Sequence, residues 1–127
     1  MKFIENSKTP LRNFGKGLSL QILLDKENGA ENLDVGIVNI QAQSETPMHV
    51  RIFEEVIVML EGSGQVVSES GEVVTLNQHD CILIPAGVMH KHVNHTDKPL
   101  KQLYIFAPQA PQTVQDQLRG LPILSDK

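Results

Sequence analysis

The sequence lacks several features that would place it in a specialised class of protein. It has a single cysteine, Cys81, no tryptophan, and no apolar run that approaches the roughly 18 residues of a transmembrane helix. One cysteine excludes an intramolecular disulfide and fits a reducing compartment. The N-terminus has no signal-like apolar core. We therefore expect a cytoplasmic protein with no membrane partner, in which Cys81 is a small apolar filler within a strand.

Clustered positive charge and several catalytic motifs are also absent. The formal net charge is −4 and no group of Lys and Arg residues stands out, which argues against binding to nucleic acid. There is no Gly-rich phosphate loop, no serine nucleophile elbow and no CxxC pair. Aromatic residues, Tyr104 among them, are too scattered for a stacking platform. The composition, 40% hydrophobic and 20% charged over 127 residues, is that of one folded domain.

The sequence does contain many short apolar segments separated by Gly and Pro turns, which favours an all-β sandwich or barrel. Strands are expected at residues 19–24, 34–41, 49–60 (with a break near Phe53), 65–68, 72–76, 81–84 and 103–107, and in the segment that carries His90 and His92. Residues 61–64 and 69–71 are expected to form hairpin turns. The spacing of Val114, Leu118 and Leu121 predicts a short terminal helix. The expected layout is an arm over 1–17, a barrel over 18–108 and a C-terminal segment over 109–127.

Residues 79–94 carry two histidines in a pattern that favours a binding site. Pro85 and Gly87 separate two apolar segments, and this predicts a tight turn between two strands. Because strand side chains alternate, His90 and His92 should face the same side of the strand that follows the turn. If that side is the interior of a barrel, the two imidazoles converge on one point.

Two motifs in the middle of the chain resemble those of the cupin superfamily, in particular its small single-domain members. The first motif is His49-x-Arg51-x-x-x-Glu55 followed by Gly62, and the second is Pro85-x-Gly87-x-x-His90-x-x-x-Asn94. His79 stands where the family usually has glycine. The resemblance implies a double-stranded β-helix, a jelly-roll-like barrel, in which His49, Glu55 and His90 bind one divalent metal. It does not identify the reaction, since one fold carries many chemistries.

The sequence departs from the family pattern at Arg51, where a second metal-binding histidine is usual. A guanidinium stays protonated and cannot bind a metal. At roughly 6 Å and an effective dielectric of about 20, its charge would cost a divalent ion on the order of 5 kcal/mol, which Glu55 would offset. His92 could replace the missing ligand, or it could only line the cavity. The resulting set of ligands suits Zn, Fe, Mn, Ni or Cu.

Neighbouring residues have less specific roles. Arg51 could pair with Glu55 inside the barrel, point to solvent, or grip a carboxylate or phosphate with its planar fork. Ile57 and Met59 share the strand face of Glu55, so they are expected to line a ligand-binding cavity. Glu54 and Arg51 are the candidate catalytic residues, with Glu54 able to move protons.

Three classes of function fit these patterns. The first, which we favour, is a metal-dependent enzyme (lyase, isomerase, cyclase or dioxygenase) that acts on an anionic or oxygen-rich small molecule. The second is a non-catalytic cupin that binds a sugar or organic acid, and the third is a metal-free enzyme similar to sugar epimerases. The resemblance to small cupins also implies a homodimer, because the apolar segment 18–24 would need covering as a sheet edge. His79 and His95, in polar turns, are expected at the surface.

Overall fold

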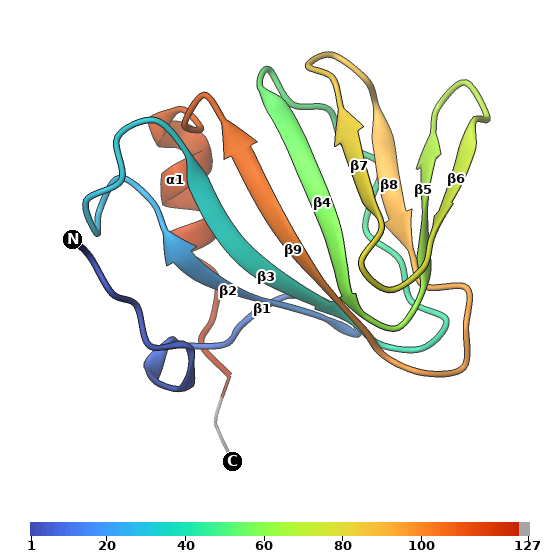
Figure 1. The fold of residues 1–127 in the computed structure, drawn as a ribbon, viewed down its shortest axis with the longest axis horizontal. Coiled ribbons are helices and arrows are strands. Elements are labelled where there is room, and N and C mark those ends of the chain that lie inside the picture. The colour runs from blue at the N-terminus through green and yellow to red at the C-terminus, as the bar shows by residue number, and fades with distance from the viewer. Residues whose placement is uncertain (125–127) are drawn as a thin grey trace.

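Two antiparallel β-sheets and one C-terminal helix make up the structure, a computed structural model that describes residues 1–124 (Figure 1). The larger sheet has the order β1-β2-β3-β9-β4-β7 and the smaller one β6-β5-β8. The strands are β1 (Arg12–Gly15), β2 (Leu18–Leu24), β3 (Asp34–Ile40), β4 (Glu54–Glu61), β5 (Gly64–Ser68), β6 (Val73–Leu76), β7 (Cys81–Ile84), β8 (His90–Val93) and β9 (Leu100–Ala107). The helices are η1 (Asn6–Lys8) and α1 (Gln112–Arg119). The prediction of an all-β, cupin-type barrel with a short C-terminal helix is confirmed.

The expected N-terminal arm contains a strand that covers the edge of β2. In β1, Arg12 lies opposite Leu20 of β2, and Gly15 lies opposite Leu18. The Arg12 guanidinium donates hydrogen bonds to the backbone carbonyls of Arg119 (2.7 Å) and Leu121 (3.2 Å). The apolar segment that seemed to need a partner chain is therefore covered from within the same chain.

Two turns carry the chain from the larger sheet to the smaller one. The turn at 61–64 joins β4 to β5, which lie in different sheets, so the prediction of a hairpin there is wrong. The physical reason is that both edges of β4 are already paired, with β9 and with β7. The turn at 69–71 does close an antiparallel pair, β5 with β6. The turn after β7 leads into β8 of the smaller sheet, and Gly87 there adopts a φ of +85° that favours glycine.

Residues 44–49 run beside β8, although they form no regular strand. The Thr46 amide donates to the His92 carbonyl (2.9 Å), and His49 and His90 exchange backbone hydrogen bonds of 2.8 Å. Pro47 has no amide proton and interrupts the pairing between these two contacts. The predicted break near Phe53 separates this segment from β4, which begins at Glu54, and His49 lies directly opposite His90.

The interior is formed by alternate residues of the strands. Along β4 the pattern of buried and exposed residues alternates, and Ile57 and Met59 are almost completely buried. Cys81 of β7 is exposed, which contradicts its expected role as an apolar filler. Cys81 and Leu83 occupy alternate positions of β7 and are both exposed, so the face of β7 that they share is not covered. Among residues 1–124, no helix has both the length and the apolar character needed to cross a membrane.

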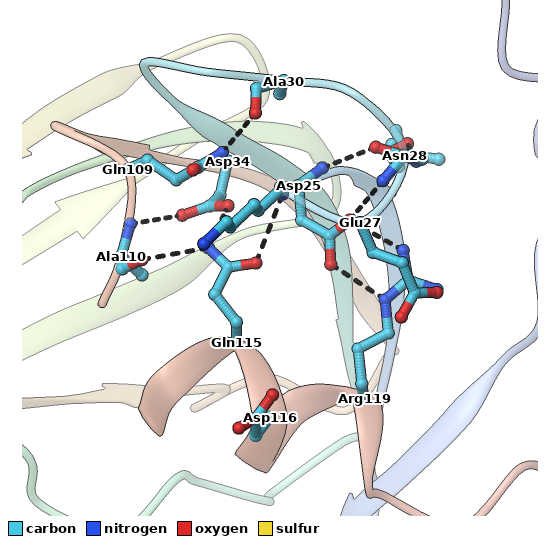
Figure 2. Close-up of polar contacts among 12 residues, drawn as sticks. Asp25, Glu27, Asn28, Ala30, Asp34, Gln109, Ala110, Gln115, Asp116 and Arg119 are labelled. Carbon is cyan, nitrogen blue, oxygen red and sulfur yellow. Dashed lines mark hydrogen bonds and ion pairs between the residues drawn. The ribbon is translucent and has the colours of Figure 1, made fainter. Parts of the chain in front are cut away.

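A buried polar cluster fixes α1 against the larger sheet (Figure 2). We name this cluster of Asp25, Asp34, Gln115 and Arg119 the α1 anchor. Arg119 makes a bidentate pair with Asp25 (2.8 and 2.7 Å), and Gln115 donates to Asp34 (2.7 Å). Asp34 also accepts a hydrogen bond of 2.7 Å from the Ala110 amide. These bonds hold α1 over the part of the sheet formed by β2, β3 and β9.

Candidate metal centre

Four side chains from three separate segments meet inside the barrel. Within the described residues, His49, Glu55, His90 and His92 each offer a ligand atom, and these atoms all lie within 4.8 Å of one another. His49 comes from the segment beside β8, Glu55 from β4, and the other two from alternate positions of β8. We name this set the histidine–glutamate cluster. The predicted ligands, His92 included, are thus brought together at one point.

Glu55 lies at the middle of the cluster. Its Oε1 is 3.3 Å from His90 Nε2 and 4.0 Å from His49 Nε2, and its Oε2 is 3.2 Å from His92 Nε2. Glu55, His90 and His92 are at most 5% exposed. His49 is partly exposed and closes the group on its outer side.

Backbone carbonyls orient two of the imidazoles. His90 Nδ1 donates to the Val88 carbonyl (2.8 Å), and His49 Nδ1 donates to the Pro47 carbonyl (3.0 Å). With the proton on Nδ1, Nε2 of each neutral ring keeps its lone pair and points it at the cluster. Imidazoles that bind metals are commonly held by this kind of outer hydrogen bond.

Several buried polar atoms of the cluster have no hydrogen-bond partner in the described part of the chain. These atoms are Glu55 Oε1, His90 Nε2 and His92 Nδ1. Glu55 Oε1 and His90 Nε2 are close enough for an ion pair but are not in hydrogen-bond geometry. A buried polar atom without a partner costs about 1–3 kcal/mol. When two lone pairs face each other, only a proton or a cation between them removes the repulsion.

The charge states of the cluster suit a cation. Burial raises the pKa of Glu55, but the imidazoles of His90 and His92 lower it further, so its pKa lies well below the usual range. Burial lowers the pKa of His49 to about 4, against a smaller opposing effect of its hydrogen bond to Pro47. Burial also lowers the pKa of His90, but the ion pair with Glu55 outweighs it, so this pKa is raised. At neutral pH the cluster therefore combines one carboxylate with a neutral His49.

The residues present fit a divalent metal. Three imidazole nitrogens and one carboxylate converge, and two of the buried atoms without a partner, Glu55 Oε1 and His90 Nε2, are groups that a cation would satisfy. This mixed set of nitrogen and oxygen donors is suitable for Zn, Fe, Mn, Ni or Cu.

A cavity of about 300 Å³ opens beside the cluster. It extends from the cluster across the larger sheet to α1. Its lining consists of Phe14, Leu20, Val38, Thr46, Pro47, His49, Arg51, Glu55, Ile57, His92, Gln102, Tyr104, Phe106, Gln117, Leu118 and Leu121. The volume lies at the lower end of the range for small-molecule sites.

Arg51 faces this cavity and makes no ion pair with a described residue. Its guanidinium carbon lies 6.0 Å from the centre of the Phe53 ring and 5.7 Å from that of Phe106. Its Nε is buried without a hydrogen-bond partner. Of the three interpretations of Arg51, the structure therefore excludes both the pair with Glu55 and the position in solvent.

Two other predicted site residues lie outside the cavity. Glu54 is on the opposite face of β4 from Glu55 and is exposed, because neighbouring strand residues point to opposite faces. This position contradicts a role for Glu54 in proton transfer at the cluster. Met59 is fully buried in the core and does not line the cavity, whereas Ile57 does. His79 and His95 are exposed, as predicted.

The contribution of β9 to the cavity was not predicted from the sequence. Gln102, Tyr104 and Phe106 occupy alternate positions of this strand and all line the cavity. Tyr104 lies opposite Gly36 of β3, where any side-chain carbon would overlap the tyrosine ring. Alternation from residue 100 onward was the available signal, but the strand was expected to begin only at residue 103.

Comparisons with known proteins agree with this geometry. The family description "Cupin domain" matches residues 36–106, more than half of the chain. No curated protein matches the sequence. Among solved structures, the polyketide cyclase RemF from Streptomyces resistomycificus is similar with a TM-score of 0.78 and 22% identity, over 87% of this chain and 82% of that protein.

Two further solved structures have a similar fold. KdgF from Halomonas sp. has a TM-score of 0.77 and 18% identity, over 89% of this chain and 98% of that one. A predicted oxalate decarboxylase from Thermotoga maritima has a TM-score of 0.75 and 18% identity, over 84% of this chain and 99% of that one. At these identities the similarity shows the fold, and the family match shows the relationship. The chain therefore belongs to the cupin superfamily.

Proposed function

We propose that this cupin is a metal-dependent enzyme that acts on an anionic or oxygen-rich small molecule inside the barrel. The observation that carries the proposal is the histidine–glutamate cluster, whose buried ligand atoms converge and are left without partners. Buried polar atoms without partners lower the stability of the folded state, so stability alone does not account for this cluster. The cavity beside it provides the space for a substrate.

His49, Glu55, His90 and His92 would hold the metal. When bound, a divalent metal at this site would supply Lewis acidity toward a substrate oxygen. Lyase, isomerase, cyclase and dioxygenase reactions all use such a site. The names of two similar structures, a polyketide cyclase and a predicted oxalate decarboxylase, fall within this range of chemistry.

The remaining cavity residues have roles that follow from their positions. His49, Glu55 and His92 line the cavity, whereas His90 does not, so a substrate would approach from the side of the first three. Ile57 and Phe106 beside Glu55 keep bulk water away from the reacting groups. Arg51 adds a positive charge that would attract and orient an anionic substrate.

The experiment that tests the proposal is metal analysis of the purified, untagged protein by plasma mass spectrometry. We expect close to one divalent transition metal per chain in the wild type. The Glu55→Gln and His90→Ala variants should retain less than about a tenth of it, because each removes a buried ligand. His92→Ala should also lower the occupancy, and unchanged occupancy would assign His92 to the cavity wall alone.

The matched controls are His79→Ala and His95→Ala, which remove exposed imidazoles that do not belong to the cluster. Both should keep the wild-type metal content. A wild type without metal, even after incubation with each candidate ion, would contradict the proposal and favour a metal-free enzyme or a non-catalytic binding protein.

A further inference from the structure

The cavity has two chemically different ends. At one end lie the histidine–glutamate cluster and Arg51. In the larger sheet, β9 and β3 separate β4, which carries Glu55, from β2. The walls beyond β9 come from five apolar side chains, Phe14, Leu20, Val38, Leu118 and Leu121, together with Gln117 of α1, which is exposed. A ligand that fills the cavity therefore meets charged groups at one end and hydrocarbon at the other.

The pairing of the strands shows how the two ends are connected. Val38 lies opposite Gln102 of β9, and Leu20 lies opposite Val38, so these residues form one row across the sheet. Tyr104 occupies the next inward position of β9 and lies opposite Ile57 of β4. The floor of the cavity thus changes from Ile57 and Tyr104 to aliphatic side chains as it approaches α1.

Arg51 is the group at the charged end that the protein itself leaves unsatisfied. Its Nε is buried and has no hydrogen-bond partner. Its guanidinium group lies near two aromatic rings, which cannot neutralise the positive charge. A guanidinium in this state matches a planar anion, because its fork donates two parallel hydrogen bonds to a carboxylate. The single guanidinium is better suited to one carboxylate than to the greater charge of a phosphate.

The far end disfavours a polyol. Gln102 is the only inward polar side chain in the row described above, and no hydrogen bond joins its amide to another described residue. Five apolar walls cannot hydrogen-bond the hydroxyl groups of a sugar acid, and each hydroxyl buried there without a partner would weaken binding. An apolar ligand body would instead gain from the burial of its surface.

We propose that the ligand is a small monocarboxylate with an apolar body. Its carboxylate binds Arg51, and its body lies over Tyr104 and Val38 beneath Leu118 of α1. This inference rests on the proposed function, since it names the class of substrate for the same cavity. In this arrangement Arg51 selects ligands by their negative charge. The side chains between α1 and the sheet select ligands with an apolar body.

Isothermal titration with four probes tests the inference: hexanoate, its neutral analogue hexanamide, the shorter acetate, and gluconate, a six-carbon carboxylate with hydroxyl groups. We expect hexanoate to bind at least about 10-fold more tightly than each of the other three. Arg51→Gln should weaken hexanoate binding by about 10- to 100-fold and leave hexanamide binding unchanged. Lys16→Gln is the matched control, because it removes one exposed positive charge outside the cavity and should change nothing.

Leu121→Trp tests the apolar end. The larger side chain should shorten the cavity and weaken hexanoate binding by about 10-fold without changing acetate binding. Circular dichroism melting curves establish that each variant is folded. If Leu121→Trp is unfolded, Gln117→Trp replaces it, since Gln117 is exposed and also lines the cavity.

The outcomes separate this inference from the proposed function. The inference would be overturned if hexanoate and hexanamide bound equally well, or if gluconate bound more tightly than hexanoate. If the wild type also bound metal, the proposed function would remain intact. Hexanoate binding that depends on Arg51 in a protein that takes up no metal would support the inference and contradict the metal-dependent reaction. Equal binding of hexanoate to the wild type and Arg51→Gln would overturn the assignment of Arg51.

Discussion

The molecule contains two buried polar clusters, and they differ in how completely their atoms are paired. In the α1 anchor each buried carboxylate accepts hydrogen bonds from side chains or backbone, and none of its atoms is among the buried atoms without a partner (Figure 2). In the histidine–glutamate cluster, three buried atoms of the described chain have no partner. Buried polar groups that are fully paired hold structure together, whereas groups left unpaired indicate a species that binds there.

The carboxylates of the two clusters also differ in what neutralises them. Burial raises the pKa of Asp25, but the hydrogen bonds and charge of Arg119 outweigh it, so this pKa is lowered. Burial raises the pKa of Asp34, and the hydrogen bonds from Ala110 and Gln115 offset this only in part. Glu55 has no guanidinium or ammonium partner and depends on imidazoles. Glu55 therefore lacks the fixed positive charge that Arg119 gives to Asp25.

The largest expected effect concerns the α1 anchor. Arg119→Met leaves Asp25 buried without its bidentate partner, and we expect the free energy of unfolding to fall by about 2–4 kcal/mol. Urea denaturation measures this change. Lys101→Met, which removes an exposed partner of Glu61, is the control and should cost less than about 1 kcal/mol. If the two variants were equally stable, the anchor would not be the structural element described here.

A smaller effect, which depends on the metal, is expected at the histidine–glutamate cluster. His92→Leu removes the imidazole whose Nε2 lies 3.2 Å from the buried Glu55 Oε2, so the metal-free variant should be less stable than the metal-free wild type by about 1–2 kcal/mol. Adding the bound metal at about 100 times its Kd should stabilise the wild type by about 2.7 kcal/mol. The same addition should stabilise Arg119→Met by a similar amount and His92→Leu by much less. Equal stabilisation of all three proteins would remove the distinction between the clusters.

The smallest expected effect is the acid dependence of the anchor. Because the folded-state pKa of Asp25 lies below its ordinary value, the stabilisation from this group is present above that ordinary value and is lost as the pH falls through the folded-state pKa. In Arg119→Met only the backbone hydrogen bonds from Asn28 and Glu27 still oppose the effect of burial on the Asp25 pKa, so this loss should become smaller. Urea midpoints between pH 5 and pH 3 measure the difference. An unchanged acid dependence in the variant would show that Asp25 is not held by Arg119.

Much of the barrel and the convergence of the cluster could be predicted because they depend on local patterns. Alternation along β8 placed His90 and His92 on one face, and the turn at Gly87 followed from its residue types. The hairpin expected at 61–64 was wrong because strand pairing is a long-range choice. Nothing within residues 54–68 shows that β4 pairs with β9 and β7 rather than with β5.

Other features depend on contacts between distant segments. The anchor joins Asp25 to Arg119 and Asp34 to Gln115, which are 94 and 81 residues apart in the sequence. The exposure of Cys81 could not be predicted, because the segment Cys81–Ile84 is apolar on both faces and gives no sign of which face is covered. The surroundings of Arg51 could not be predicted, because they depend on two aromatic rings that are distant in the sequence, Phe53 just before β4 and Phe106 of β9.

The contact between β1 and the end of the described chain has a consequence for the order of folding. The Arg12 side chain bonds to the carbonyl of a residue 107 positions later, and the Asn13 amide bonds to the Pro122 carbonyl (2.8 Å). During translation, β1 leaves the ribosome long before Arg119 and Pro122, its partners in these two contacts, have been made. The wall formed by Phe14, Leu118 and Leu121 is therefore completed last, and the newly made barrel acquires a finished cavity only after those final residues emerge.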